Sequence, residues 1–191
     1  MSETNDNGSW LGNHFAIAMP ALDDPNFDHA VIYLCEHGPE GAMGLVVNRP
    51  SDLTLGDLFE HMAFTPARGA PTDQPVFLGG PVQRERGFVL HPPGGDWDAS
   101  AQIAPDVAVT TSRDIIAALA ENRGPERFLM ALGYAGWGAG QLEEEMAGNA
   151  WLTAPADGTL LFETPIAERW QAAAARLGVD ISRMSSESGH A

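Results

Sequence analysis

The segment 128–152 constrains the fold of this 191-residue chain more than any other part of the sequence. Residues 128–132 form an apolar run of strand length, and we expect Gly133 to end that strand. Glycines then alternate with other residues as far as Gly140, and Gln141 begins a short acidic helix. A strand, a glycine loop and a helix N-terminus can together hold an anion, because backbone N–H groups converge there. The loop has no basic side chain and glutamates follow it, so the segment indicates architecture rather than a reaction.

The charge of the chain restricts its partners. The formal net charge is −16, and all ten basic residues are arginines. An acidic chain is poorly suited to a nucleic-acid backbone or to an anionic membrane surface, both of which attract clustered cations. Without lysine, the chain has no P-loop lysine, no kinase strand lysine and no Schiff base. We therefore expect neither direct nucleic-acid binding nor membrane binding.

The cellular compartment is predicted from the cysteine content and the N-terminal residues. Cys35 is the single cysteine, so an intrachain disulfide is excluded. Residues 1–11 are polar and acidic, resemble no signal peptide, and are expected to form a mobile tail. No apolar run approaches the roughly 18 residues of a membrane-spanning helix. These observations predict a cytoplasmic protein.

Short apolar runs predict a strand-rich domain. The run 30–36 is apolar on both of its alternating faces, which is typical of a central strand covered on both sides. It is expected to pair with 43–48 as an antiparallel hairpin. The predicted strands are 14–19, 30–36, 43–48, 76–78, 87–91, 107–110, 128–132 and 159–163.

Three further helices are predicted from capping residues and apolar periodicity. Thr54 with Asp57 resembles a capping box before the apolar stripe of 55–62. Thr111 with Asp114 repeats that arrangement before a second helix, and 164–178 is expected to contain a third, with Leu177 on its apolar stripe. Because helices, hairpins and strands are interleaved, we expect one domain with a mixed sheet.

Four segments resemble the AlgH/YqgE family in order and spacing: IAMPALDDPNFDHAVIYLCEHGPEGAMGLVVNRP, PVFLGGPVQRERGFVLH, TTSRDI, and GYAGWGAGQLEEEMAGNAWL with the downstream TP…RW…LG. The resemblance covers about residues 11–185. It departs from the family pattern at Gly38, where asparagine is common, and at Arg49, which is often lysine.

The resemblance implies an α+β domain with a mixed, strongly bent, partly barrel-like sheet flanked by about four helices. On that basis the domain spans 12–186, and 187–191 form a short C-terminal tail. Members of the family have no established activity, although the label "transcriptional regulator" accompanies many of them. The residues themselves show no basic recognition helix. We therefore expect a non-enzymatic regulatory or binding protein without a cofactor, which recognises a small anionic ligand or a protein partner.

Cys35 and His37 are the first candidates for chemistry. Their positions in an alternating strand place both on the same face, with Cβ atoms roughly 7 Å apart. Such a pair can act as a nucleophile or redox sensor, whereas the alternative is a buried free cysteine that fills the core. An enzyme that acts on a small anion, using Cys35 or Arg113 with His37 or His91, is the alternative function.

A candidate anion site follows the predicted strand 107–110. Thr110, Thr111, Ser112 and Arg113 combine hydroxyls, backbone N–H groups and a guanidinium at a helix start. The alternative is ordinary capping by Thr111. Gly79 and Gly80, with Arg84, either form a second wall of that pocket or make a tight turn. Acidic residues and histidines in 23–37 match no metal-binding pattern, so no metal site is predicted.

Overall fold

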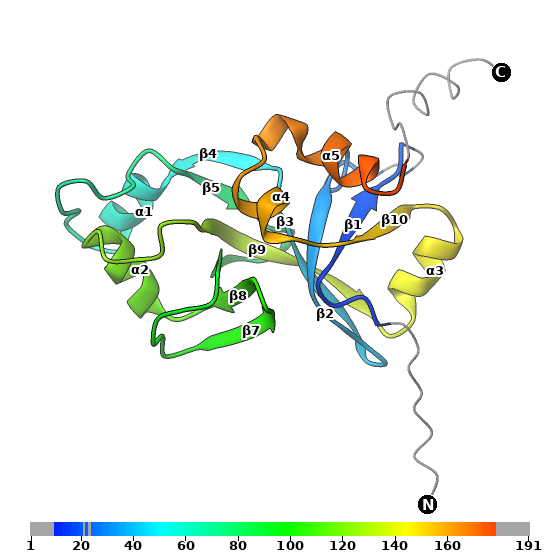
Figure 1. Cartoon of the computed structure of the whole chain (residues 1–191), viewed down its shortest axis with the longest axis horizontal. Helices are drawn as coiled ribbons and strands as arrows, with labels where there is room; N and C mark the ends of the chain where they lie inside the picture. Colours follow the sequence, from blue (N-terminus) through cyan, green and yellow to red (C-terminus); the bar gives the residue numbers. More distant parts are fainter. Residues whose placement is uncertain (1–9, 21, 23, 179–191) are drawn as a thin grey trace, which may run out of the picture.

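The computed structural model describes residues 10–178, except 21 and 23. Most of the expected tail 1–11, residues 179–186 of the expected domain and the whole of 187–191 lie outside this described part. Within it, one ten-stranded sheet is accompanied by five α-helices and a 3₁₀ helix (Figure 1). The predicted α+β domain is confirmed, with one helix more than expected.

The strands are β1 (His14–Ala18), β2 (Val31–Gly38), β3 (Gly41–Val46), β4 (Pro50–Thr54), β5 (Pro75–Leu78), β6 (Val82–His91), β7 (Ser100–Ala104), β8 (Val107–Thr110), β9 (Leu129–Gly138) and β10 (Trp151–Pro155). The helices are α1 (Leu55–His61), α2 (Arg113–Ala120), α3 (Gln141–Ala147), α4 (Gly158–Phe162), the 3₁₀ helix η1 (Ile166–Glu168) and α5 (Arg169–Ala175). Strands β4, β7 and β10 were not predicted from the sequence.

The sheet is mixed, as predicted. Eight strands follow the order β10-β1-β2-β3-β9-β6-β8-β7, and β5 joins β9 beside this path with β4 on its other side. The pairing of β5 with β9 is parallel, whereas the other pairings are antiparallel. The predicted hairpin is formed by β2 and β3.

Strand β9 joins the two halves of the sheet. Its first half pairs with β5 and β6, and its second half pairs with β3. The prediction that Gly133 ends this strand was wrong. Gly133 has φ +78°, and an added Cβ would lie 2.4 Å from the carbonyl oxygen of Gly80. Glycine therefore lets β9 pass close to a second backbone and continue to Gly138.

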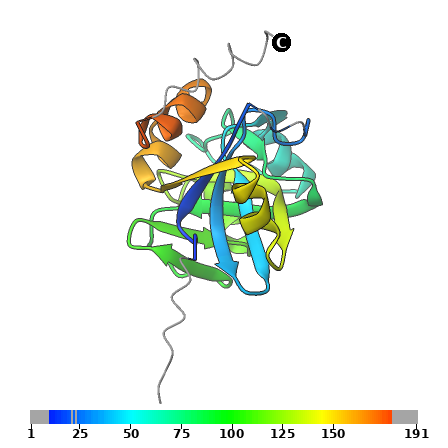
Figure 2. The ribbon, with the colours of Figure 1, turned by 90° about the vertical axis from the view of Figure 1, so that its right-hand side faces the viewer.

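The curled sheet separates three apolar clusters. The central cluster fills the concave side, where Phe15, Tyr33 and Leu90 meet residues from α4 and α5. Two outer clusters lie on the opposite side, one under α3 and one under α1 and α2. Figure 2 shows α3 in front of the strands of the first half. Because β2 contributes Tyr33 to the inner cluster and Ile32 to an outer one, it is buried on both faces as predicted.

The segment predicted as a strand at 159–163 is instead α4. Asp157 caps this helix, because its side chain accepts a hydrogen bond from the backbone N–H of Leu160 at 2.8 Å. Leu160 and Leu161 are adjacent and both belong to the central cluster, whereas adjacent side chains of a strand point to opposite faces. The Asp157 cap and the packing of both leucines in one cluster therefore favour a helix over the predicted strand.

The other predicted helices are confirmed with two corrections. Thr54 and Asp57 form both bonds of a capping box at α1. The N-cap of α2 is Ser112 rather than Thr111, because the Thr111 N–H still bonds to the carbonyl oxygen of Ala99, just before β7. At the other end of the chain, α5 forms as expected, but Leu177 is exposed. Among the described helices, none is long and apolar enough to cross a bilayer.

Candidate functional site

Four hollows formed by described residues can be compared as sites. The concave pocket measures about 540 Å³ and surrounds Cys35, Arg86 and Tyr134, and the helix-side pocket measures about 300 Å³ and surrounds Thr110 and Arg113. The arginine pocket measures about 150 Å³ and lies around Arg49 and Arg84. The loop pocket measures about 580 Å³ and lies around Trp97, Arg123 and Arg127. The loop pocket is the largest, but its two arginines pair with Glu121 and Glu163. The concave pocket combines volume with a varied lining.

The concave pocket lies on the inner face of the sheet. Its apolar wall includes Met43, Phe88, Ala101 and Val109, which come from β3, β6, β7 and β8. Its polar side chains are those of Cys35, Glu36, Arg86, Thr111 and Tyr134. The Arg86 guanidinium lies over the Phe88 ring, 5.2 Å from its centroid, and Tyr134 meets the same ring edge-on. An apolar wall with a few polar groups is the usual lining of a small-molecule site.

A β-bulge in β2 decides which residues face this pocket. Leu34 pairs with Gly44 and Glu36 with Met43, so Cys35 is the extra residue between them. A bulge of this kind interrupts the alternation of the strand. As a result Cys35 and Glu36 both line the concave pocket, and His37 faces the opposite side. The prediction that Cys35 and His37 share a face was therefore wrong.

The surroundings of Cys35 disfavour a reactive thiolate. Burial raises the pKa of the thiol to about 12, and the neighbouring negative charge of Glu36 acts in the same direction. Its Sγ lies 3.9 Å from the carbonyl oxygen of Tyr33. A thiol with such a pKa is protonated at neutral pH and is a weak nucleophile.

His37 is held on the outer side, between the N-terminal segment and α3. Its Nδ1 accepts a hydrogen bond from the Leu11 N–H at 2.9 Å, so its Nε2 donates to Glu143. Trp10 packs edge-on against the ring. The pKa of Glu143 is lowered by its own backbone N–H and then by His37. His37 thus fixes the chain before β1 to α3.

His91 is also remote from the concave pocket. It is buried, with Nδ1 2.7 Å from the Pro92 carbonyl oxygen and Nε2 2.7 Å from the Thr110 hydroxyl. Phe88 and Leu90 of the same strand belong to the inner cluster, so alternation directs His91 outward. Burial lowers the pKa of His91, and the Pro92 carbonyl offsets part of this change. Neither His37 nor His91 therefore lines the pocket that contains Cys35, and neither lines the helix-side pocket that contains Arg113.

The predicted anion residues Thr110 to Arg113 line the helix-side pocket, between the sheet and the helices α1 and α2. Thr110 is fully buried. The Ser112 hydroxyl accepts from the Ala99 N–H, and Arg113 donates to the Met62 carbonyl oxygen at 2.9 Å while lying over the Phe64 ring. These polar groups hold neighbouring elements together. Thr111 also lines the concave pocket.

Gly79 and Gly80 do not form a wall of that site. A Cβ on Gly80 would lie 2.0 Å from the Tyr134 carbonyl carbon, and one on Gly79 would lie 2.3 Å from the Gly133 oxygen. Both glycines are needed where the chain before β6 passes close to β9. Gly80 and Arg84 line the arginine pocket instead. Of the two alternatives left open by the sequence, a shared pocket wall is not formed, because the two groups line different hollows.

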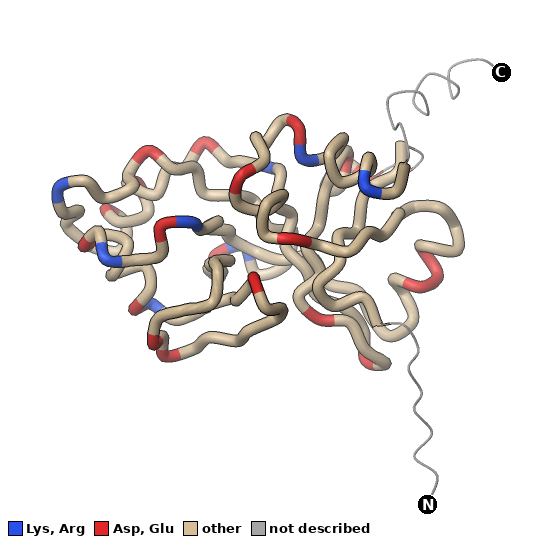
Figure 3. Tube along the Cα trace, in the orientation of Figure 1, with Lys and Arg blue, Asp and Glu red and all other residues tan. Residues whose placement is uncertain are grey.

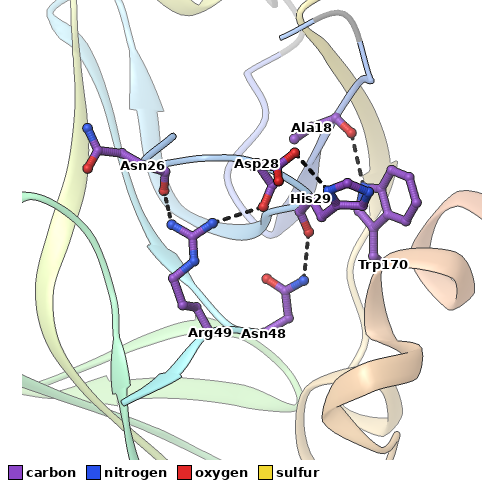
Figure 4. A network of polar contacts seen from close by, with 7 residues as sticks. All are labelled: Ala18, Asn26, Asp28, His29, Asn48, Arg49 and Trp170. Atoms are coloured by element: carbon purple, nitrogen blue, oxygen red, sulfur yellow. Dashed lines mark hydrogen bonds and ion pairs between the residues drawn. The ribbon is translucent and has the colours of Figure 1, made fainter. Parts of the chain in front are cut away.

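Arg49, which sequence reasoning did not select, is the second arginine of that pocket. Its guanidinium donates to the carbonyl oxygens of Asn26 and Asp28 (Figure 4). The adjacent Asn48 side chain donates to the His29 carbonyl oxygen, and the His29 ring packs against Trp170 at a tilt of 56°, with ring centroids 4.3 Å apart. The loop that precedes β2 thus fixes the Arg49 guanidinium. Because this loop is distant from Arg49 in the sequence, no local pattern predicted the contact.

The stretch 82–86 at the start of β6 supplies one charged side chain to each of three pockets. Between Val82 and Gly87 this strand departs from regular pairing with β9. Arg84 lines the arginine pocket, Glu85 the helix-side pocket and Arg86 the concave pocket. The position of Arg86 two residues before Phe88 was the sequence signal that could have placed it on the inner face.

The family assignment agrees with this architecture. The model of the AlgH-like family (DUF179) matches residues 15–182, and the chain belongs to that family. A UPF0301 protein from Thioalkalivibrio sulfidiphilus is 59% identical over 180 residues, covering 94% of this chain and 96% of its own length. A UPF0301 protein from Nitrosococcus oceani is 53% identical over 182 residues, covering 95% and 97%.

Two solved structures resemble the fold. The solution structure of the AlgH protein from Pseudomonas aeruginosa has a TM-score of 0.78 and 47% sequence identity, with both chains covered completely. A crystal structure of a protein from Corynebacterium diphtheriae has a TM-score of 0.72 over 92% of this chain and 91% of its own. The second is 19% identical, so it shows the shared fold alone. The AlgH-like family is uncharacterised in function, and the curled sheet is its common architecture.

Proposed function

We propose that this protein is a binding protein that receives a small amphipathic anion in the concave pocket. One observation carries the proposal: Arg86 lies over an aromatic ring of an otherwise apolar wall, in a hollow of about 540 Å³. Pockets for small molecules commonly measure roughly 300–1,000 Å³ and combine apolar walls with a few polar groups. The ligand class is therefore an apolar body that carries one acidic group.

The charges of the pocket also suggest an orientation for the ligand. Arg86 forms no ion pair with the described carboxylates, and the hydroxyls of Thr111 and Tyr134 line the same pocket. A guanidinium stays charged at any physiological pH and binds carboxylate or phosphate through paired N–H groups. Glu36, from β2, repels an anion. The acidic group is therefore expected beside Arg86 and the apolar body against Phe88 and Val109.

Binding is preferred to catalysis because the candidate catalytic groups are separated. Cys35 lines the pocket as a protonated thiol, whereas His37 and His91 face the other side of the sheet. Nucleophilic catalysis requires an activated nucleophile and a base within hydrogen-bond reach of it. A non-enzymatic role fits this arrangement better than the alternative enzyme.

A regulatory role is part of the proposal, with a ligand or a protein partner as its target rather than DNA. In Figure 3 the basic positions are scattered among acidic ones instead of forming a stripe. With a net charge of −16, such a surface does not favour a phosphate backbone. A cytoplasmic location is included in the proposal because the free Cys35 suits a reducing compartment.

The test uses 8-anilinonaphthalene-1-sulfonate, a fluorescent probe with an apolar body and one sulfonate. We expect saturable binding to the full chain that weakens about tenfold or more in Arg86→Gln, since a charge-assisted hydrogen bond is worth about 1.5–3 kcal/mol. Ala101→Trp, which fills the pocket from an exposed position on β7, should remove binding. Arg123→Gln, in the loop pocket, is the matched control and should bind as the wild type does. Equal probe affinity in all four proteins would overturn the proposal.

A further inference from the structure

The arginine pocket differs from the other three hollows in its charge. Its lining holds Arg49 and Arg84 and no described carboxylate, whereas each of the other hollows includes at least one glutamate. Neither arginine forms an ion pair with a described residue. Two unneutralised guanidinium groups beside one small hollow raise the local concentration of anions, even on a chain that is acidic as a whole.

Arg49 is held in a defined position before any ligand arrives. Its two terminal nitrogens donate to the main-chain oxygens of Asn26 and Asp28, the second at 2.9 Å. Its side chain is half-buried, and the carbonyl acceptors are neutral, so its charge is fixed in place without being cancelled. A guanidinium has five N–H donors, so others remain for a ligand. Fixing the group in advance reduces the entropy that binding must offset.

The rest of the lining limits what can fit. The hollow measures about 150 Å³, and Leu78, one of the large apolar side chains that remain exposed, forms part of its rim. The backbone at Gly80 is fixed by its close approach to Tyr134 of β9, so the hollow has one rigid side. These dimensions suit a single oxyanion group with a small apolar substituent rather than an extended molecule.

We propose that the arginine pocket binds an oxyanion, a carboxylate or a phosphate, between the guanidinium groups of Arg49 and Arg84. This site lies on the opposite side of the sheet from the concave pocket and does not depend on the function proposed for it. Arg84 is exposed and supplies a second charged donor, while Arg49 provides the fixed one. A short apolar group on the anion would lie against Leu78.

The test is an NMR titration of the ¹⁵N-labelled full chain with inorganic phosphate and, separately, with isobutyrate. Sodium chloride at matched ionic strength is the reference, because it reproduces general screening. We expect saturable shifts of the Arg49 and Arg84 Nε–H signals and of the Gly80 amide for at least one of the two anions. A larger affinity for isobutyrate would show the contact with Leu78, and a larger one for phosphate would show that charge dominates; both support an oxyanion site.

Arg84→Gln is the decisive variant, because the Arg84 side chain is exposed and its replacement should leave the fold intact. It should weaken the saturable binding about tenfold or more. Arg123→Gln, in the loop pocket and outside both proposed sites, is the matched control and should leave it unaltered. Shifts no larger than those with chloride, or the same affinity in Arg84→Gln, would overturn the proposal whatever the result of the sulfonate titration.

Discussion

The concave pocket and the arginine pocket receive neighbouring arginines from one strand but are built differently. The concave pocket is a sheet surface, where Phe88 and Val109 alternate inward and Arg86 extends the same alternation. The arginine pocket is made where loops cross the outer side and two glycines allow backbones to touch. Strand alternation thus places the aromatic and arginine side chains of the first site, whereas long-range packing places the arginines of the second. Substitutions in the two pockets can separate these two origins.

The reactivity of Cys35 tests whether the concave pocket holds a protonated, unreactive thiol. With a pKa raised to about 12 by burial, the thiol should react with iodoacetamide roughly a thousandfold more slowly at pH 8 than a free cysteine of ordinary pKa. Mass spectrometry of native and urea-unfolded protein measures both rates. Rapid alkylation of the native chain at neutral pH would instead support the enzyme alternative.

Gly80→Ala should disrupt the close backbone contact that forms one side of the arginine pocket. The new Cβ would lie 2.0 Å from the backbone of Tyr134, so the chain before β6 must move away from β9. We expect a loss of more than about 3 kcal/mol in the free energy of unfolding, measured by urea denaturation. Gly38→Ala is the control, since no atom lies within 4 Å of its added Cβ. A loss below about 1 kcal/mol would show that the close passage is not required.

His91, on the outer side of the sheet, should make the free energy of unfolding depend on pH, an effect not expected from the concave pocket. Burial lowers the pKa of His91 in the folded chain, so the unfolded chain binds more protons as the pH falls below about 6.5. The stability contributed by neutral His91 is therefore present above that pH and is lost as the pH falls towards the folded pKa. Urea denaturation between pH 5 and 8 should show a smaller decline on acidification in His91→Gln than in the wild type. Parallel curves would exclude His91 as the cause.

The smallest expected effect is the coupling between the two pockets, which should bind their ligands independently of each other. Arg84→Gln and Arg86→Gln act on opposite sides of the sheet, so their effects on sulfonate-probe binding should add in the double variant to within about 0.5 kcal/mol. Fluorescence titration of the wild type, the two single variants and the double variant measures this double-mutant cycle. A coupling above about 1 kcal/mol would show that the irregular stretch 82–86 transmits changes from one pocket to the other.

Sequence reasoning placed many strands but few site residues. The hairpin of β2 and β3 and the capping box of α1 depend on residues that are close in sequence, and both are present. The prediction that Cys35 and His37 share a face was wrong because one bulge reverses the alternation that a regular strand would keep. The prediction of a strand at 159–163 was wrong because a short apolar run suits either a strand or a short helix. The Asp157 cap favours the helix.

The sequence by itself determined the family, the mixed α+β class and the chemistry that a chain of −16 charge without lysine does not favour. The family follows from four motifs in order and spacing, whereas the fold class and the disfavoured chemistry follow from composition, periodicity and local capping, which act between near neighbours. Tertiary structure alone decided that β9 continues past Gly133, that Arg49 joins Arg84, and that the anion candidates lie in separate pockets. The physical reason is that bulges and close backbone contacts depend on strands brought together from distant parts of the chain, so no local pattern specifies which face a charge will occupy.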